Sequence, residues 1–215
     1  MQTRLIGIAT LTLSLLGFAS EGLAQRRPSR PPPGVTVEAD GSLSLGSREK
    51  QYLDLAVRCG DQVRAVVERW LDSKEITAEQ LWAQLYFPIA KTNPPKFETP
   101  WLAYAERDMQ PILDACVATD TSLLFVIFVD TNGYLPVHNP KYRQKTTGNA
   151  AEDLSRNRTR RIFNDQVGLA AARNTEPFLA QTYMRDNGET FADLSVPVMV
   201  KGVHFGAIRV GYPIK

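Results

Sequence analysis

Apolar residues recur every three or four positions in two parts of the chain, which is the spacing of a helix with one buried face. The first part predicts a long helix over about 47–73, with an apolar stripe at Tyr52, Leu55, Cys59, Val63, Val66 and Trp70. The second predicts a helix over about 101–117, bent at Pro111, with a stripe at Leu102, Ala105, Met109, Ile112 and Cys116. Between them, the capping-box pattern Thr77-Ala-Glu-Gln80 predicts the start of a short helix, and 88–100 is expected to be a loop.

Continuous or alternating apolar positions predict strands in the second half of the chain. The run from Leu123 to Val129 is too short for a helix and is rich in β-branched and aromatic residues, which favours a buried strand. Asp130-Thr-Asn-Gly133 then has the composition of a turn. Three further strands are expected over 178–186, 189–200 and 203–212, joined by turns at Asn187-Gly188 and Lys201-Gly202.

The segment from Asn149 to Asn174 separates the first strand from the other three. It mixes many charged residues with a few apolar ones, which indicates short helices that pack over another layer rather than further sheet. The order along the chain is therefore helices, one strand, a helical insertion and an antiparallel meander. This order predicts an α+β fold with helices on one side of an antiparallel sheet.

The N-terminus has the pattern of a secretory signal peptide. Arg4 precedes an apolar stretch over 5–18, and small residues follow up to Ala24, so we expect 1–24 to be cleaved off. The alternative is an uncleaved membrane anchor, although the stretch is short for spanning a bilayer. Residues 25–46 are rich in proline and arginine and predict a solvated linker. The remaining segment, 47–215, has the length of one domain, which we expect in the periplasm.

The two cysteines, Cys59 and Cys116, each lie on the predicted buried face of a helix. Two packed helices could bring them together, and in an oxidising compartment a disulfide is the expected outcome. The alternative is a pair of buried free thiols, because cysteine is common in protein cores.

Composition and motifs narrow the class of function. The net charge of +2 gives no strong field for binding nucleic acid. The chain contains no Gly-x-Ser-x-Gly or His-Glu-x-x-His motif and no glycine-rich phosphate loop, so we expect that it is not an enzyme. No Cys-x-x-Cys-His motif is present, which excludes covalently attached c-type haem.

Four segments of the second half carry a family resemblance. They are Asn132-Gly-Tyr-Leu-Pro-Val-His-Asn139, Arg158-Thr-Arg-Arg-Ile-Phe-Asn-Asp165 with the following 168–175, Phe178-Leu-Ala-Gln-Thr-Tyr-Met-Arg-Asp186, and 196–212. Together these segments resemble the extracytoplasmic sensor domain of bacterial methyl-accepting chemotaxis proteins, over roughly 81–212. The chain departs from that family at Val137, where threonine is usual, and at Phe205, where tryptophan is usual.

The resemblance implies a Cache or PAS-like fold, in which a long N-terminal helix and a central antiparallel sheet carry a pocket under the helical insertion. It also implies a sensor that binds a small molecule. Nothing similar to a second membrane span or a signalling coiled coil is seen up to Lys215. We therefore expect signalling through a membrane-bound partner, or through a homodimer formed by the first helix.

The residues themselves suggest the nature of the pocket. Guanidinium groups in the insertion could clamp a carboxylate, and alternation over 178–186 puts Gln181 and Tyr183 on one half-polar face. We expect a small polar or anionic ligand. The expected ligand-binding residues are Tyr134, His138, Asn139, Arg160, Arg173, Asn174, Gln181 and Tyr183. The alternative for the arginines is a solvated helix face, with Asp153 and Asp165 as local partners.

Two other functions stay open. His138 and His204, the only histidines, could hold a metal or non-covalent haem, although each could equally make one ordinary hydrogen bond. We expect no metal and no cofactor as the simpler reading. The other alternative is an interaction module whose pocket is filled by its own side chains.

Overall fold

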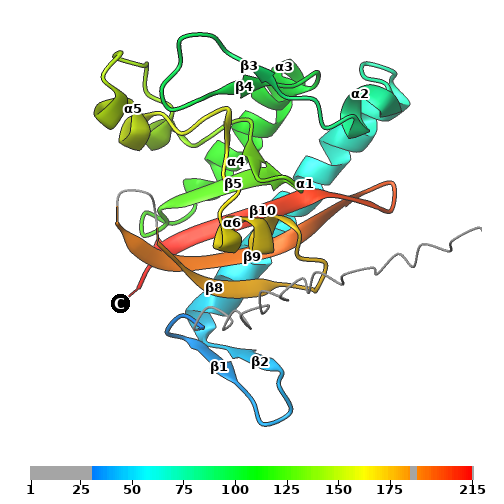
Figure 1. The fold of residues 1–215 in the computed structure, drawn as a ribbon. Coiled ribbons are helices and arrows are strands. Elements are labelled where there is room, and N and C mark those ends of the chain that lie inside the picture. Colours follow the sequence, from blue (N-terminus) through cyan, green and yellow to red (C-terminus); the bar gives the residue numbers. More distant parts are fainter. Residues whose placement is uncertain (1–30, 185–187, 215) are drawn as a thin grey trace, which may run out of the picture.

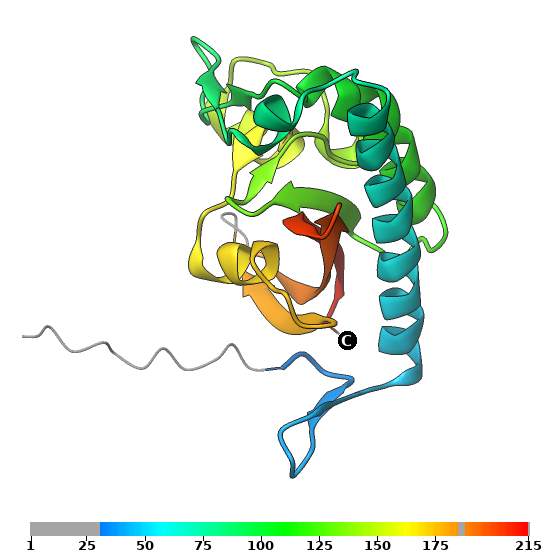
Figure 2. The same ribbon diagram turned by 90° about the vertical axis from the view of Figure 1, so that its right-hand side faces the viewer.

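The computed structural model describes residues 31–184 and 188–214. The predicted signal peptide over 1–24 and the first residues of the predicted linker lie outside this part of the chain. Within it, a four-stranded antiparallel sheet lies between a long helix and a layer of shorter elements (Figures 1 and 2). Across the sheet, the strands are β5 (Phe125–Asp130), β10 (Val203–Pro213), β9 (Thr190–Val200) and β8 (Leu179–Met184). The α+β prediction is confirmed, including the meander of the last three strands.

The long helix α1 (Ser47–Asp72) packs along one face of the sheet and matches the predicted helix closely (Figure 2). Its buried stripe includes Tyr52, Val63 and Trp70, as its apolar spacing predicts. At Gly60 the helix lies directly against the sheet, because a Cβ placed there would be in van der Waals contact with the Ile208 side chain at 3.6 Å. The helix therefore covers the sheet with apolar contacts along most of its length.

A disulfide joins α1 to α4 (Gln110–Val117), which lies beside it. Cys59 and Cys116 are both buried, and their Cα atoms are 6.5 Å apart. The predicted bond between them is confirmed. The bond closes a large loop, which contains all the elements between α1 and α4.

The third predicted helix is divided into three parts. The short helix α3 (Leu102–Tyr104) leads into a π-helical turn, η1 (Ala105–Met109), and α4 follows. Pro111 lies in the first turn of α4, directly after the π-helical turn, and it has no N–H to donate to the preceding turn. The N–H of Gln110 instead reaches back five residues to the carbonyl oxygen of Ala105. The predicted bend at the proline is therefore a widened turn before it.

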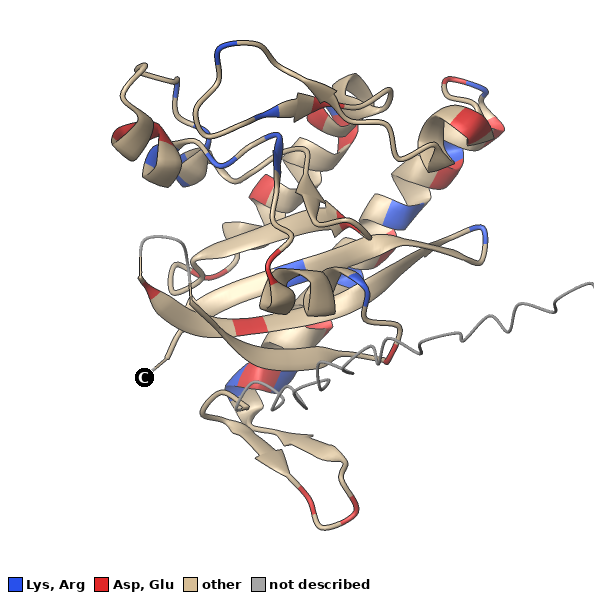
Figure 3. Ribbon diagram, in the orientation of Figure 1, with Lys and Arg blue, Asp and Glu red and all other residues tan. Residues whose placement is uncertain are grey.

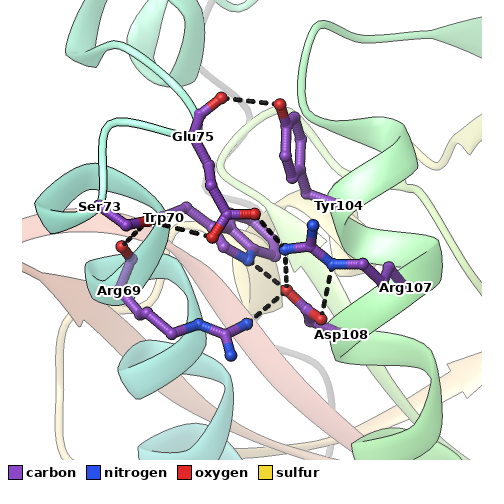
Figure 4. Close-up of polar contacts among 7 residues, drawn as sticks. All are labelled: Arg69, Trp70, Ser73, Glu75, Tyr104, Arg107 and Asp108. Carbon is purple, nitrogen blue, oxygen red and sulfur yellow. Dashed lines mark hydrogen bonds and ion pairs between the residues drawn. The ribbon is translucent and has the colours of Figure 1, made fainter.

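The π-helical turn presents Asp108 to the end of α1 (Figure 4). Asp108 Oδ2 accepts hydrogen bonds from Trp70 Nε1 and Arg69 Nη2, both at 2.6 Å, and from Arg107 Nη2 at 2.7 Å. Arg107 also pairs with Glu75 at 2.5 Å. The Arg107 hydrogen bonds hold the pKa of the Asp108 carboxyl at about 2. These contacts fix the end of α1 against the turn.

Of the two short segments between α1 and α3, one matches its prediction and one differs from it. The capping box at Thr77 and Gln80 is confirmed at the start of α2 (Ala78–Trp82). The predicted loop over 88–100, however, contains a hairpin of β3 (Phe87–Pro88) and β4 (Phe97–Glu98). Its strands are only two residues long, which is too short for an alternation of apolar and polar residues to predict them.

A second hairpin precedes α1, where the sequence predicted a linker. Its strands are β1 (Val35–Val37) and β2 (Leu43–Leu45), with exposed residues between them. The N–H of Gly46 donates to the carbonyl oxygen of Gly34, which closes the hairpin beside the first turn of α1 (Figure 1). Regular structure thus begins before Ser47.

The insertion covers the face of the sheet opposite α1. It contains β6 (Tyr134–Leu135), the 3-10 helix η2 (Pro140–Tyr142), α5 (Ala150–Arg156), β7 (Arg161–Ile162) and α6 (Gln166–Ala172). Short helices are confirmed here, and the structure adds the β6–β7 pair. In Figure 2, α1 and α6 lie on opposite sides of the sheet. Both faces are therefore covered, rather than one.

The two sides of the sheet differ because the strands alternate. On β9 and β10, Leu194, Val196 and Ile208 face α1, whereas Asp193 and Arg209 face the insertion, and all five are buried. No helix in the ranges that the structure describes combines the length and the apolarity needed to cross a membrane.

Candidate ligand-binding chamber

A small chamber lies between the insertion and the face of the sheet that carries Asp193 and Arg209. Its volume is about 30 Å³, which is room for about two water molecules. Aromatic and aliphatic side chains make most of the wall, and polar groups come from both layers. The lining residues are Phe125, Ile127, Leu135, His138, Arg158, Phe163, Tyr183, Phe191 and Arg209.

The floor of the chamber is a buried ion pair on the sheet. Arg209 Nη2 lies 2.8 Å from Asp193 Oδ2, and the side chains are only 4% and 0% exposed. Burial opposes the charge of Arg209, but the Asp193 carboxylate outweighs it and raises the pKa of the guanidinium. Gln181 donates to Asp193 Oδ2 at 3.0 Å and to the Val167 carbonyl oxygen at 2.8 Å. The guanidinium thus stays charged, and the Gln181 amide holds its partner Asp193 in place.

Tyr183 connects the floor to α6. Its ring packs beneath the guanidinium of Arg209, 5.0 Å from the ring centre, and its hydroxyl donates to Asp165 Oδ2 at 2.8 Å. Asp165 is the N-cap of α6, since its other oxygen accepts the N–H of Gly168 at 2.9 Å. Burial raises the pKa of Tyr183 above its ordinary value, so the phenol remains a hydrogen-bond donor.

Arg158 and His138 reach the chamber from the insertion. The guanidinium of Arg158 packs over the Phe163 ring at 5.0 Å and donates to the Leu154 carbonyl oxygen at 3.3 Å. The His138 ring lies 4.8 Å from the ring of Tyr142, and its Nδ1 accepts the N–H of Asn139 at 2.8 Å. Two guanidinium groups therefore meet at a cavity with apolar walls, a combination that suits an oxyanion. The phenol of Tyr183 lies beside them, with its O–H donated to Asp165.

Of the expected ligand-binding residues, His138 and Tyr183 line the chamber, and Gln181 lies directly behind its floor. Tyr134 lies in the core on the α1 side, where its hydroxyl donates to the Phe97 carbonyl oxygen and its ring packs against Trp101. The amide of Asn139 accepts the N–H of Val126 and donates to the carbonyl oxygen of Leu113.

The other three expected residues lie outside the chamber. Arg160 pairs with Glu106 at 2.6 Å beside a separate cleft. Arg173 donates to the Thr131 carbonyl oxygen at 3.0 Å, and Asn174 donates to the Glu176 carbonyl oxygen at 3.0 Å. The structure therefore does not bring these side chains together with His138 and Tyr183.

The residues that sequence reasoning did not select are Arg158, Asp193 and Arg209. A signal for the last two was present, because each is a charged residue in the middle of a strand that is otherwise apolar. Opposite charges on neighbouring buried strands indicate a pair, since an isolated buried charge is strongly unfavourable.

The two histidines lie on opposite sides of the sheet. His138 lines the chamber, whereas His204 borders a pocket with Trp82, Trp101 and Phe205. His204 Nε2 lies 2.9 Å from the Gly206 carbonyl oxygen, and burial lowers the pKa of its ring. Among the residues that the structure describes, no group of three or more His, Cys, Asp or Glu side chains could hold a metal ion.

Comparisons with known proteins add little to this geometry. No protein-family model matches the sequence, and no curated protein matches it. Among solved structures, an extracellular ligand binding receptor from Desulfohalobium retbaense DSM5692 is similar, with 13% sequence identity and a TM-score of 0.37. The match covers 84% of this chain and 28% of that chain, so this chain spans little more than a quarter of the receptor. A likeness at this level does not establish a shared function.

Proposed function

We propose that this protein is an exported, single-domain sensor module that binds a small oxyanion, such as a short carboxylate, in the chamber. The observation that carries the proposal is the meeting of Arg158, Arg209 and Tyr183 at a buried cavity with apolar walls. Guanidinium groups bind planar carboxylates through paired hydrogen bonds, and a low-dielectric surrounding strengthens such contacts.

The size of the chamber limits the ligand. A volume of about 30 Å³, room for about two water molecules, limits the ligand to the smallest oxyanions, such as formate, acetate or nitrate. A larger metabolite would require the insertion to move away from the sheet. We therefore propose a ligand smaller than an amino acid.

The arrangement of elements supports a Cache or PAS-like sensor, with the ligand site between a central antiparallel sheet and an inserted layer. The Cys59–Cys116 bond supports a location outside the cytoplasm, since disulfides persist in oxidising compartments. We propose the periplasm, and we propose that the occupied domain signals to a membrane-bound partner or dimerises through α1. In this proposal the protein binds its ligand without transforming it.

Neither alternative from the sequence is supported as well. Haem is far larger than the chamber, and His138 lines the chamber whereas His204 borders another pocket. The interaction module without a ligand has one observation in its favour, because Asp193, Arg209 and Gln181 already satisfy one another. It remains the second candidate.

The experiment is a thermal-shift series on the mature protein with sodium formate, acetate, nitrate and bicarbonate, each against sodium chloride at equal ionic strength. An anion present at a hundredfold excess over its Kd stabilises the native state by about 2.7 kcal/mol. For a domain of this size, we expect the melting temperature to rise by about 5–10 °C.

Two variants assign the shift to the chamber. Arg158→Gln should remove it, and Tyr183→Phe should reduce it while preserving the shape of the wall. The matched control is Arg64→Gln, which removes the same charge from an exposed ion pair with Asp61 on α1. A flat response of the wild-type protein to every anion would contradict the proposal and favour the interaction module.

A further inference from the structure

A second and much larger cavity lies on the other side of the insertion from the chamber. Its volume is about 370 Å³, which is within the usual range of small-molecule sites. It opens between the β3–β4 hairpin, η1 and the segment around residues 157–160. We propose that this cleft is a separate binding site for an organic molecule that carries a carboxylate or phosphate group. Its polar lining includes Thr92, Lys96, Glu106, Gln110, Arg143 and Arg160.

The charge of the lining favours an anion. Lys96, Arg143 and Arg160 border the cleft, whereas Glu106 is the one carboxylate among the residues that line it in the described chain. Basic positions recur along this part of the molecule, from the hairpin to the segment after α5 (Figure 3). Cationic groups that converge on a concave surface raise the local concentration of anions.

Lys96 is the deepest of the three cations and supplies the strongest argument. Its side chain is buried, and its Nζ donates to Asn157 Oδ1 at 2.7 Å and to the carbonyl oxygens of Thr159 and Asn157 at 2.6 and 3.2 Å. All three acceptors are uncharged, and no carboxylate within the described residues forms an ion pair with this ammonium group. Buried charges in proteins are normally paired with an opposite charge. A bound anion would provide that charge.

The pKa of Lys96 is consistent with a buried ammonium group that lacks an ion-pair partner among the described residues. Burial, followed by the positive charges of Arg161 and Arg160, lowers the pKa of its ammonium group to about 8, although the charge of Asp153, which is too distant for an ion pair, acts in the opposite direction. A ligand anion would oppose both effects and stabilise the charged form. Binding should therefore weaken as the pH rises above about 8, because deprotonation removes the charge that faces the ligand.

Arg160 is held at the rim of the cleft by an unusual backbone conformation. Its φ is +60°, a region that residues other than glycine rarely adopt. The N–H of Arg160 donates to the Leu135 carbonyl oxygen at 2.6 Å, and its own carbonyl oxygen accepts the N–H of Phe97 at 2.7 Å. These bonds fix the position from which the guanidinium reaches Glu106. Both partners are part-exposed, so a ligand anion can compete for the arginine.

The cleft and the chamber are separate but share a thin wall. Leu135 and His138 line the chamber, whereas Pro136 and Val137, between them, line the cleft. Arg143 Nη1 and Gln110 Nε2, on the cleft side, both donate to the carbonyl oxygen of His138. The two sites can therefore be tested one at a time, and neither proposal depends on the other.

The test is isothermal titration calorimetry of the mature protein at low salt and pH 7, with succinate and inorganic phosphate as separate probes. We expect saturable binding of at least one probe, and the two arms show whether the site prefers a carboxylate or a phosphate. Arg160→Gln should weaken binding about tenfold or more, which is about 1.4 kcal/mol. Lys96→Met should abolish it, and wild-type affinity for succinate, which is a dianion throughout this range, should fall between pH 7 and pH 9.

Controls keep the result specific to the cleft. Arg64→Gln removes an exposed charge elsewhere and should leave the affinity unchanged, as should Tyr183→Phe in the chamber. If Lys96→Met does not fold, Arg160→Gln and the pH dependence still decide the question. The proposal is overturned if neither probe binds at millimolar concentration, or if Arg160→Gln binds as the wild type does. Loss of binding in Tyr183→Phe alone would also overturn it, because it would place the probe in the chamber.

Discussion

The two faces of the sheet are built from the same strands but are stabilised in different ways. Under α1, side chains such as Leu194 and Ile208 are fully buried in one continuous apolar core. Under the insertion, the neighbouring positions Asp193 and Arg209 are equally buried but charged. Apolar packing stabilises a fold directly, whereas a buried ion pair often contributes no more than apolar residues of the same shape would.

This difference separates the face that we expect to contribute most to stability from the face at which we propose a ligand site. The α1 face has the long helix, the disulfide and the larger core. The opposite face keeps polar groups at the expense of stability, which is typical of sites that bind other molecules.

Removing one member of the buried pair should have the largest effect. Asp193→Ala leaves the Arg209 guanidinium buried without its partner, so we expect it to lower the free energy of unfolding by about 3–5 kcal/mol. Replacing both residues, as Asp193→Leu with Arg209→Met, should restore most of that stability. Urea denaturation of the single and double variants measures both values.

The control on the opposite face is Leu194→Ala, which creates a cavity in the α1 core and should cost about 2–5 kcal/mol. A second substitution, of Ile208 by another apolar residue of similar size, should not restore the stability lost in Leu194→Ala. This differs from the double variant of the ion pair, which restores most of the stability lost in Asp193→Ala. If Asp193→Ala proves nearly neutral, the floor of the chamber is not the buried ion pair described here.

The disulfide should contribute almost as much to the free energy of unfolding as the buried ion pair, and it acts on the α1 side of the sheet. The bonded cysteines are 57 residues apart, and in the chain-entropy model a loop of this length adds about 4 kcal/mol. We expect Cys59→Ala with Cys116→Ala to lose about this amount in urea denaturation. A reductant should destabilise the wild type in the same way and leave the double variant unchanged. Anion shifts in the chamber should survive in the variant, provided that it is folded.

The α1 face could be predicted from the sequence, and the opposite face largely could not. The helical stripe that contains Cys59 and Trp70 and the capping box at Thr77 are local patterns, and each one matches the structure. The alternation of the last strands also fixed which residues share a side. This alternation places Gln181 and Tyr183 on one face, and in the structure both face the insertion.

The chamber was harder to predict because it depends on side-chain directions in irregular segments. After the turn at Gly133, Tyr134 packs toward the α1 core, whereas His138 points to the chamber. The spacing of these residues does not distinguish the two directions. The arginines of the insertion are equally ambiguous, since Arg158 enters the chamber and Arg160 turns to the cleft.

Asp108 lies at the rim of the α1 face. Its contribution to the free energy of unfolding should be moderate and should depend on pH. The pKa of Asp108 is lowered to about 2 in the folded protein, so its contribution is fully present above about pH 4 and is lost as the pH falls toward 2. We expect Asp108→Asn to cost about 1–2 kcal/mol at pH 7 and to flatten the pH dependence of stability in that window.

The matched control for Asp108→Asn is Asp61→Asn. It removes a carboxylate from an exposed ion pair with Arg64, and both residues of that pair lie on α1. We expect it to change stability by less than about 0.5 kcal/mol. Urea denaturation at pH 7, 4 and 3 compares the two variants. Equal effects at all three values would show that Asp108 does not hold the end of α1 through its charge.

The smallest effect should come from Tyr183→Phe, which removes one hydrogen bond between the sheet and α6 and leaves the packing of the ring unchanged. Losing the bond to Asp165 should cost about 1 kcal/mol, because Asp165 keeps its N-cap contact with Gly168. Hydrogen exchange offers the sharper readout. If the face under the insertion is the more easily opened one, amides of α6 should exchange faster in this variant, while those of α1 keep their protection. Faster exchange in both helices would mean that the two faces open together, and the contrast between them would then not extend to dynamics.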